Sequence, residues 1–236
     1  MKNWVKHLFT GNYNILLFFL FFLFIFRPYE YGEAYRGIWK TFLTITLIVA
    51  IFNCHHSHRI KVFISILAVP VLILTWVNLF YQTLGNYVLT SIFTSFFMLI
   101  CAGSIIQDVI LQARVNIETL RGLICAYFLV AFLFAYIYFF IEYLSPGTMQ
   151  IGAHTVDLES HPHFFSDMLY FSFVTLLTIG YGDIVPIKEW GESTAVIEGI
   201  IGQFYIAILV ARIISVYSFL SGKQYVKAMV KPHKKK

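Results

Sequence analysis

Long apolar runs separated by short polar stretches divide the chain into segments of membrane-spanning length. A run of about 20 apolar residues crosses the hydrocarbon core of a bilayer as a helix. The runs predict six transmembrane helices, at residues 13–27, 38–53, 60–81, 87–107, 121–144 and 194–219. The first run follows Lys2 and Lys6, as in a signal peptide, but Arg27-Pro28 comes after it in place of a small-residue cleavage site. We therefore expect this segment to be retained.

The composition agrees with an integral membrane protein. Of the 236 residues, 59% are hydrophobic and 12% are charged, which is far from the usage of a soluble domain. We expect an all-α fold. Cys54, Cys101 and Cys125 lie singly in or beside apolar segments, without the paired spacing of a metal site or a disulfide framework. The sequence has no phosphate loop, nucleophile elbow or zinc-ligand spacing, so it gives no support to an enzyme or a cofactor.

The basic residues predict the orientation of the chain, because cytoplasmic loops are rich in Lys and Arg. With a cytoplasmic amino terminus, the basic positions that fall inside are Lys2, Lys6, Arg59, Lys61, Arg114, Arg121 and the lysines from Lys223 to Lys236. The loops after residue 144 that fall outside are neutral or acidic. We expect a multi-pass protein of the cell (plasma) membrane with both termini in the cytoplasm.

The same distribution explains the net charge of +5 without nucleic acid as a partner. The basic residues gather in the carboxyl-terminal tail, residues 222–236, at the predicted cytoplasmic face. Anionic lipid headgroups attract each such charge by about 1 kcal/mol. We therefore expect membrane lipids, anionic at this face, to be partners.

The polar stretch between the last two apolar segments contains Thr178-Ile179-Gly180-Tyr181-Gly182-Asp183. Gly180 and Gly182 can adopt positive φ, which a residue with a Cβ reaches only at a cost. Backbone carbonyls along this stretch can therefore turn toward one axis. A Gly-rich turn in a loop is the alternative, but irregular backbone at membrane depth is tolerated only where it lines a cavity or is buried in protein.

This stretch and its surroundings resemble the selectivity filter of the potassium channel family. The resemblance covers residues 121–221, with an outer helix, a turret, a pore helix at about 165–177, the filter and an inner helix. It implies that potassium is the permeant ion and that four chains form a homotetramer, because one chain supplies a quarter of each ring of carbonyls. The implied potassium ligands are the carbonyls of Thr178, Ile179, Gly180 and Tyr181, with the hydroxyl of Thr178 below them.

The resemblance also implies a set of residues that support the filter: Gly182, Asp183, Tyr170 and Thr175. Ser166 and Asp167 have side chains suited to cap the start of the pore helix. Tyr170 has a hydroxyl that can bond Asp183, whereas Phe171 and Val174 have no polar group for this purpose. We therefore expect a filter that is less tightly braced than in relatives with tryptophan or a carboxylate at these positions.

Small and polar residues in the last segment are candidates for the cavity and the gate. Gly202 stands where the family often has a hinge glycine, Gly199 is also available, and Gln203 maps to a position that faces the cavity. A small residue in a membrane helix serves equally well as a packing contact. Glu198 and Arg212 lie in the same segment, where ionisable groups are usually paired or face a pore.

The four segments ahead of the pore, residues 1–120, resemble an uncharged voltage-sensor-like domain in topology alone. The fourth segment, Tyr87 to Gln107, contains no Arg or Lys, whereas voltage sensing needs several charges there. We expect a four-helix scaffold domain, a pore domain at residues 121–221 and a basic tail. Two groups are candidates for sensing pH or binding metal, with ordinary loop roles as the alternative: His55, His56 and His58, and His154, His161 and His163 with Asp157 and Glu159.

The function that follows is passive, potassium-selective conduction that is not classically voltage-gated. The alternatives are a non-conducting regulatory subunit and the pore subunit of a potassium transporter. Such transporters usually carry four degraded filter loops in one chain, whereas this chain has one complete filter.

Overall fold

The computed structural model describes residues 13–26, 33–53, 58–81, 83–111, 117–156, 158, 161 and 163–229. Several positions singled out from the sequence lie outside this part of the chain: Lys2, Lys6, Arg27-Pro28, Cys54, His55, His56, Arg114, Asp157, Glu159 and residues 230–236. The side chains of His58 and Arg59 are also outside it.

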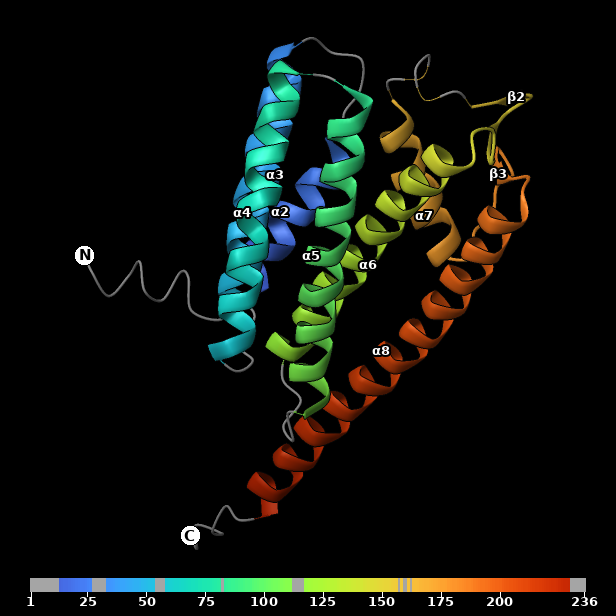
Figure 1. The fold of residues 1–236 in the computed structure, drawn as a ribbon. Coiled ribbons are helices and arrows are strands. Elements are labelled where there is room, and N and C mark those ends of the chain that lie inside the picture. The colour runs from blue at the N-terminus through green and yellow to red at the C-terminus, as the bar shows by residue number, and fades with distance from the viewer. Residues whose placement is uncertain are drawn as a thin grey trace, which may run out of the picture.

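Helices dominate the described residues, which confirms the all-α membrane fold (Figure 1). The helices are α2 (Tyr13–Ile25), α3 (Glu33–Asn53), α4 (His58–Phe80), α5 (Leu84–Leu111), α6 (Ile117–Leu144), α7 (Phe164–Leu176) and α8 (Glu189–Met229). Each predicted segment corresponds to one of them, with ends that differ by up to ten residues. The largest difference is at α8, which begins at Glu189 and continues through Gly222 into the expected tail.

In the described part of the chain, five helices are long and apolar enough to cross a membrane: Tyr35–Asn53, Ile60–Phe80, Leu84–Val109, Ile117–Leu144 and Glu189–Arg212. The first predicted span is shorter. Helix α2 has 13 residues, which at 1.5 Å per residue make about 20 Å, less than the roughly 30 Å of a hydrocarbon core. Its Leu16 and Leu20 are fully buried, so one face of α2 is packed against the protein, while Phe18 on another face is exposed.

Helix α6 lies at the centre of the chain, in contact with α2, α5, α7 and α8. The short α7 packs between α6 and α8, and α8 runs away from the other helices toward the carboxyl end (Figure 1). Only 17% of the apolar window of α8 is buried inside the single chain, against 61% for α6. The chain therefore leaves most of α8 to be covered by something other than its own helices.

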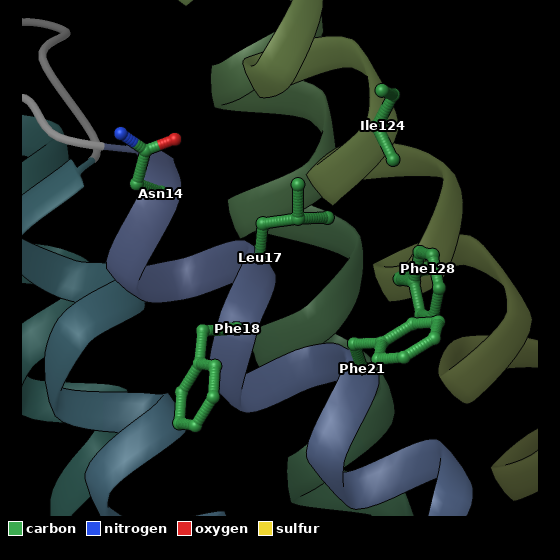
Figure 2. A pocket seen from close by; sticks show the side chains of 6 residues that line it. All are labelled: Asn14, Leu17, Phe18, Phe21, Ile124 and Phe128. Carbon is green, nitrogen blue, oxygen red and sulfur yellow. The ribbon is translucent and has the colours of Figure 1, made fainter.

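Aromatic rings join α2, α6 and α7. The ring of Phe173 lies 4.4 Å from that of Phe24 and 5.2 Å from that of Phe128 between centroids, distances at which aromatic pairs attract. Further along, α2 and α6 border an apolar groove of about 470 Å³. Figure 2 shows Phe21 of α2 beside Phe128 of α6 in this groove, with 6.3 Å between the ring centroids.

A small antiparallel sheet follows α6 and was not expected from the sequence. Its strands are β1 (Met149–Ile151), β2 (His154–Thr155) and β3 (Ile184–Pro186), in the order β2-β1-β3. Gln150 pairs with Thr155 on one side and with Val185 on the other. The strand β3 ends at Pro186. The sheet joins the stretch before α7 to the stretch after the Gly-rich loop.

Candidate functional site

From Thr178 to Gly182 the backbone has positive φ at every second residue. Gly180 and Gly182 have φ of 60° and 78°, as the sequence predicted, and Thr178 has φ of 57°, which was not foreseen. Uniform strand geometry points successive residues to opposite sides. Positive φ at alternate residues instead turns successive carbonyls toward the same side. This backbone costs Thr178 roughly 1–2 kcal/mol, because its Cβ crowds the following carbonyl.

The end of α7 holds the first residues of this loop. The backbone N–H groups of Leu177, Thr178 and Ile179 donate to the carbonyls of Phe173, Thr175 and Val174 at 2.9, 3.0 and 2.9 Å. In a trans peptide the carbonyl points opposite to the N–H of the next residue. Because the N–H of Ile179 points back into α7, the carbonyl of Thr178 points away from it.

The far end of the loop is held by a side chain and by the sheet. Tyr170 Oη of α7 donates to Asp183 Oδ2 at 2.8 Å, the contact that the sequence allowed. The carbonyl of Asp183 accepts from the N–H of Gly152 at 2.8 Å. The next residues form β3, which pairs with β1. The loop is thus fixed at both ends while residues 177–183 remain exposed in the single chain.

A buried carboxylate at the end of α6 positions the turn that leads into β1. Glu142 has no exposed surface, and its oxygens accept from the backbone N–H groups of Gly147 and Met149, the latter at 2.8 Å. Nothing in the local sequence marks Glu142, because its partners are backbone groups. Through β1 and β3, this contact also fixes the exit of the loop.

A second buried carboxylate, Glu198 of α8, ties three helices together behind the loop. Tyr138 Oη of α6 donates to Glu198 Oε2 at 2.6 Å, and Ser172 Oγ of α7 contacts Glu198 Oε1. Ser172 Oγ is also 2.9 Å from the carbonyl oxygen of Ala131. Of the two possibilities that the sequence left open for Glu198, a paired group or one that faces a pore, the single chain shows a paired group.

Gly202 is a packing contact at the last turn of α7. A Cβ at this position would lie 2.5 Å from the carbonyl oxygen of Leu176, too close for any residue but glycine. A Cβ at Gly199 would meet nothing within 4 Å in the single chain. Of the two roles that the sequence left open for Gly202, the structure supports packing. Gln203, beside it, is exposed.

The expected caps of α7 are wrong. The helix begins at Phe164 with His163 at the N-cap and no side-chain cap bond. Ser166 is buried in the first turn, and Asp167 Oδ2 lies 2.7 Å from His161 Nε2. Two of the loop histidines, His161 and His163, therefore gather at the start of α7, whereas His154 lies in β2.

The similarity to known proteins includes the pore half of the chain. Residues 123–219 match the model of a family described as "Ion channel". Over 82 residues the chain is 35% identical to Two-pore potassium channel 5 of Arabidopsis thaliana, covering 34% of this chain and 20% of that protein. Over 61 residues it is 36% identical to Intermediate conductance calcium-activated potassium channel protein 4 of Rattus norvegicus, covering 26% and 14%.

A shorter relative is covered more fully. The chain is 29% identical over 99 residues to Protein LctB of Bacillus caldotenax, with 42% of this chain and 72% of that protein covered. The chain thus spans a fifth or less of the length of the first two relatives. No solved structure matches. The pore half is thus similar to an ion channel module, and the first two relatives are named as potassium channels.

We predict that Gly202→Ala destabilises the contact between α8 and α7. The added methyl group must displace backbone at Leu176, and overpacking of this kind costs about 1–3 kcal/mol. Thermal unfolding of the purified protein in detergent would show the loss. Gly199→Ala is the matched control on the same helix, and an equal effect of both substitutions would contradict a specific contact at Gly202.

We predict that Glu198→Leu destabilises the protein more than Glu198→Gln does. Leucine leaves the hydroxyl of Tyr138 buried without a partner, at about 1–3 kcal/mol, and leaves Ser172 with the carbonyl of Ala131 alone. Glutamine keeps one acceptor for Tyr138 and gains a donor for Ser172. The midpoint of thermal unfolding should fall in the order wild type, Gln, Leu, while Glu192→Gln at an exposed position of α8 changes nothing. Equal midpoints for Leu and Gln would remove the network as the cause.

Proposed function

We propose that four copies of this chain form a channel that conducts potassium passively and selectively. The observation that carries the proposal is the alternation of positive φ at Thr178, Gly180 and Gly182, in a loop held at both ends beside α7. Four such loops around an axis would offer rings of carbonyl oxygens in place of the hydration shell of the ion. In this proposal the carbonyls of Thr178 to Tyr181 are the potassium ligands, and potassium is the permeant ion.

The distribution of exposed apolar surface supports assembly with further copies. Ile179 is 46% exposed and Tyr181 is 68% exposed in the single chain. The same is true of one long face of α8, where Phe204 is 68% exposed. Large exposed apolar patches mark interfaces with protein or membrane. A fourfold arrangement would bury the loop residues against neighbouring loops and part of α8 against neighbouring helices.

The position of α7 adds an electrostatic argument. The helix ends directly before the loop, so its negative dipole end lies where a cation would enter. In the proposed channel this end would stabilise a potassium ion below the ring of Thr178. In the proposed channel Gln203 would face the cavity, and Gly199, one turn before it, would be the remaining candidate for a hinge. Thr175, Gly182, Asp183 and Tyr170 are assigned to support the filter.

The amino-terminal helices are proposed to be a scaffold that is not a voltage sensor. Helix α5, the fourth of them, contains no Lys or Arg along its 28 residues. We assign residues 1–120 to this scaffold, 121–221 to the pore domain and 222–236 to a basic region at the cytoplasmic face. With the termini in the cytoplasm, the basic end would contact anionic lipid of the cell membrane.

Two other functions fit the family. A non-conducting regulatory subunit would keep the fold without passing ions, and a transporter subunit would move potassium only when coupled to a gradient or ATP. The complete loop with its alternating backbone favours conduction. Neither alternative explains why the loop should be held so firmly at both ends and yet be exposed.

We predict that liposomes containing the protein take up potassium in preference to sodium and that Gly180→Ala abolishes this uptake. Alanine cannot hold φ of 60° without strain, so the ring of carbonyls is lost. Gly103→Ala is the control, since Gly103 lies in α5, away from the loop, and an added Cβ there meets nothing within 4 Å. Equal uptake of both ions would exclude the proposed selectivity. A correctly folded tetramer without flux would favour the regulatory subunit.

A further inference from the structure

The position of the Gly-rich loop is set by the last turn of α7. The backbone N–H groups of Thr178 and Ile179 donate to the carbonyls of Thr175 and Val174 in this turn, at 3.0 and 2.9 Å. Residues 177–183 are exposed in the single chain, so these bonds hold the first residues of the loop from behind. A sideways shift of the turn therefore carries the carbonyl of Thr178 with it.

Helix α8 packs against one side of this turn. Glu198 of α8 contacts Ser172 of α7, and Gly202, one turn further along α8, lies against Leu176, one turn further along α7. Phe173 points to another side of α7, because neighbouring residues are about 100° apart around a helix. Its side chain is 6% exposed, so elements other than α8 cover that side.

Helix α2 supplies part of that cover. The ring of Phe24 lies 4.4 Å from the ring of Phe173 between centroids, and the ring of Phe128 of α6 lies 5.2 Å from it. Phe24 and Phe128 are 6.3 Å apart and nearly perpendicular, which completes a triangle of three rings from three helices. Edge-to-face pairs at such distances attract each other beyond the effect of burial alone. The triangle lies directly behind the turn that holds the loop.

Helix α2 is itself held in place. At its start, the ring of Tyr13 lies so close to Gly122 of α6 that a Cβ there would be 3.1 Å from it. On the side of α3, Phe22 stacks on Phe42 with 4.0 Å between the ring centroids. Because α3 and α6 both pack on α2, the ring of Phe24 is presented to α7 at a fixed place.

From these contacts we infer that Phe24 is a positioning residue for the Gly-rich loop and for its selection of potassium. Its ring keeps Phe173, and with it the last turn of α7, at the distance from the axis at which four loops form rings of carbonyls. The inference rests on the proposed function, because it concerns the same loop. It gives the first helix of the amino-terminal half a role in ion selection, whereas a scaffold needs only to pack.

Potassium and sodium uptake by liposomes containing Phe24→Ala tests the inference. The substitution leaves space into which the ring of Phe173 can turn, because a structure relaxes only partly around a lost side chain. Selectivity depends on how the carbonyls surround the ion. We expect the ratio of potassium to sodium uptake to fall by about two- to tenfold, the factor that one aromatic pair is worth.

Phe18→Ala is the matched control, since it is the same substitution on the same helix at a side chain that is 63% exposed. It should keep the ratio of the wild type. Phe24→Leu keeps an apolar side chain, so it should give a smaller fall, and it replaces Phe24→Ala if the alanine variant does not assemble. A loss of stability alone would lower the amount of assembled protein without changing the ratio. Equal ratios in the wild type and both Phe24 variants, or an equal fall in Phe18→Ala, would overturn the inference.

Hydrogen exchange separates the inference from the proposed function, because it needs no ion flux. The amides of Thr178 and Ile179 are protected by their bonds to α7, and local opening of α7 exposes them. Their exchange should be faster in the Phe24 variants than in the wild type and in Phe18→Ala. A wild type without potassium preference would overturn the proposed function. Faster exchange would then still support Phe24 as the residue that positions the loop, and unchanged exchange would overturn it.

Discussion

Irregular backbone at the depth of a membrane has to be supported by protein, and this requirement organises the pore half of the chain. Lipid offers no hydrogen bonds, so an extended loop survives there only where protein buries it or water reaches it. The loop from Thr178 to Gly182 meets this condition from one side. The last turn of α7 accepts its first N–H groups, and β3 continues from its end. Its other side is open in the single chain.

The support of the loop comes from elements that are far apart in the sequence. Glu142 orders the turn before β1, and β1 holds β3. Glu198 joins α8 to α6 and α7 through Tyr138 and Ser172. The two carboxylates are fully buried, and each accepts hydrogen bonds from groups that would otherwise be unsatisfied. They act on the loop only through the helices and strands that they position.

Local geometry could be predicted from the sequence, and long-range partners could not. The positive φ of Gly180 and Gly182 follows from the residue type, and Tyr170 and Asp183 lie close enough along the chain for their contact to be foreseen. The partners of Glu198 are 26 and 60 residues away, and those of Glu142 are backbone groups without a sequence signature. The predicted caps of α7 are wrong because the carboxylate of Asp167 contacts His161 and not the backbone N–H groups at the start of the helix. The positive φ of Thr178 is imposed by its neighbours against its own preference.

Helix α7 joins two environments that are otherwise separate. Its first residues, Phe164 and Phe165, line a cavity together with residues of α3, α4, α5 and α6, and the carbonyls of its last turn accept from the first N–H groups of the loop. A hydrogen-bonded helix of 13 residues transmits displacement along its axis with little compression. It connects the amino-terminal helices to the Gly-rich loop. A displacement at the start of α7 would therefore reach the loop through this helix, although α5 contains no Lys or Arg.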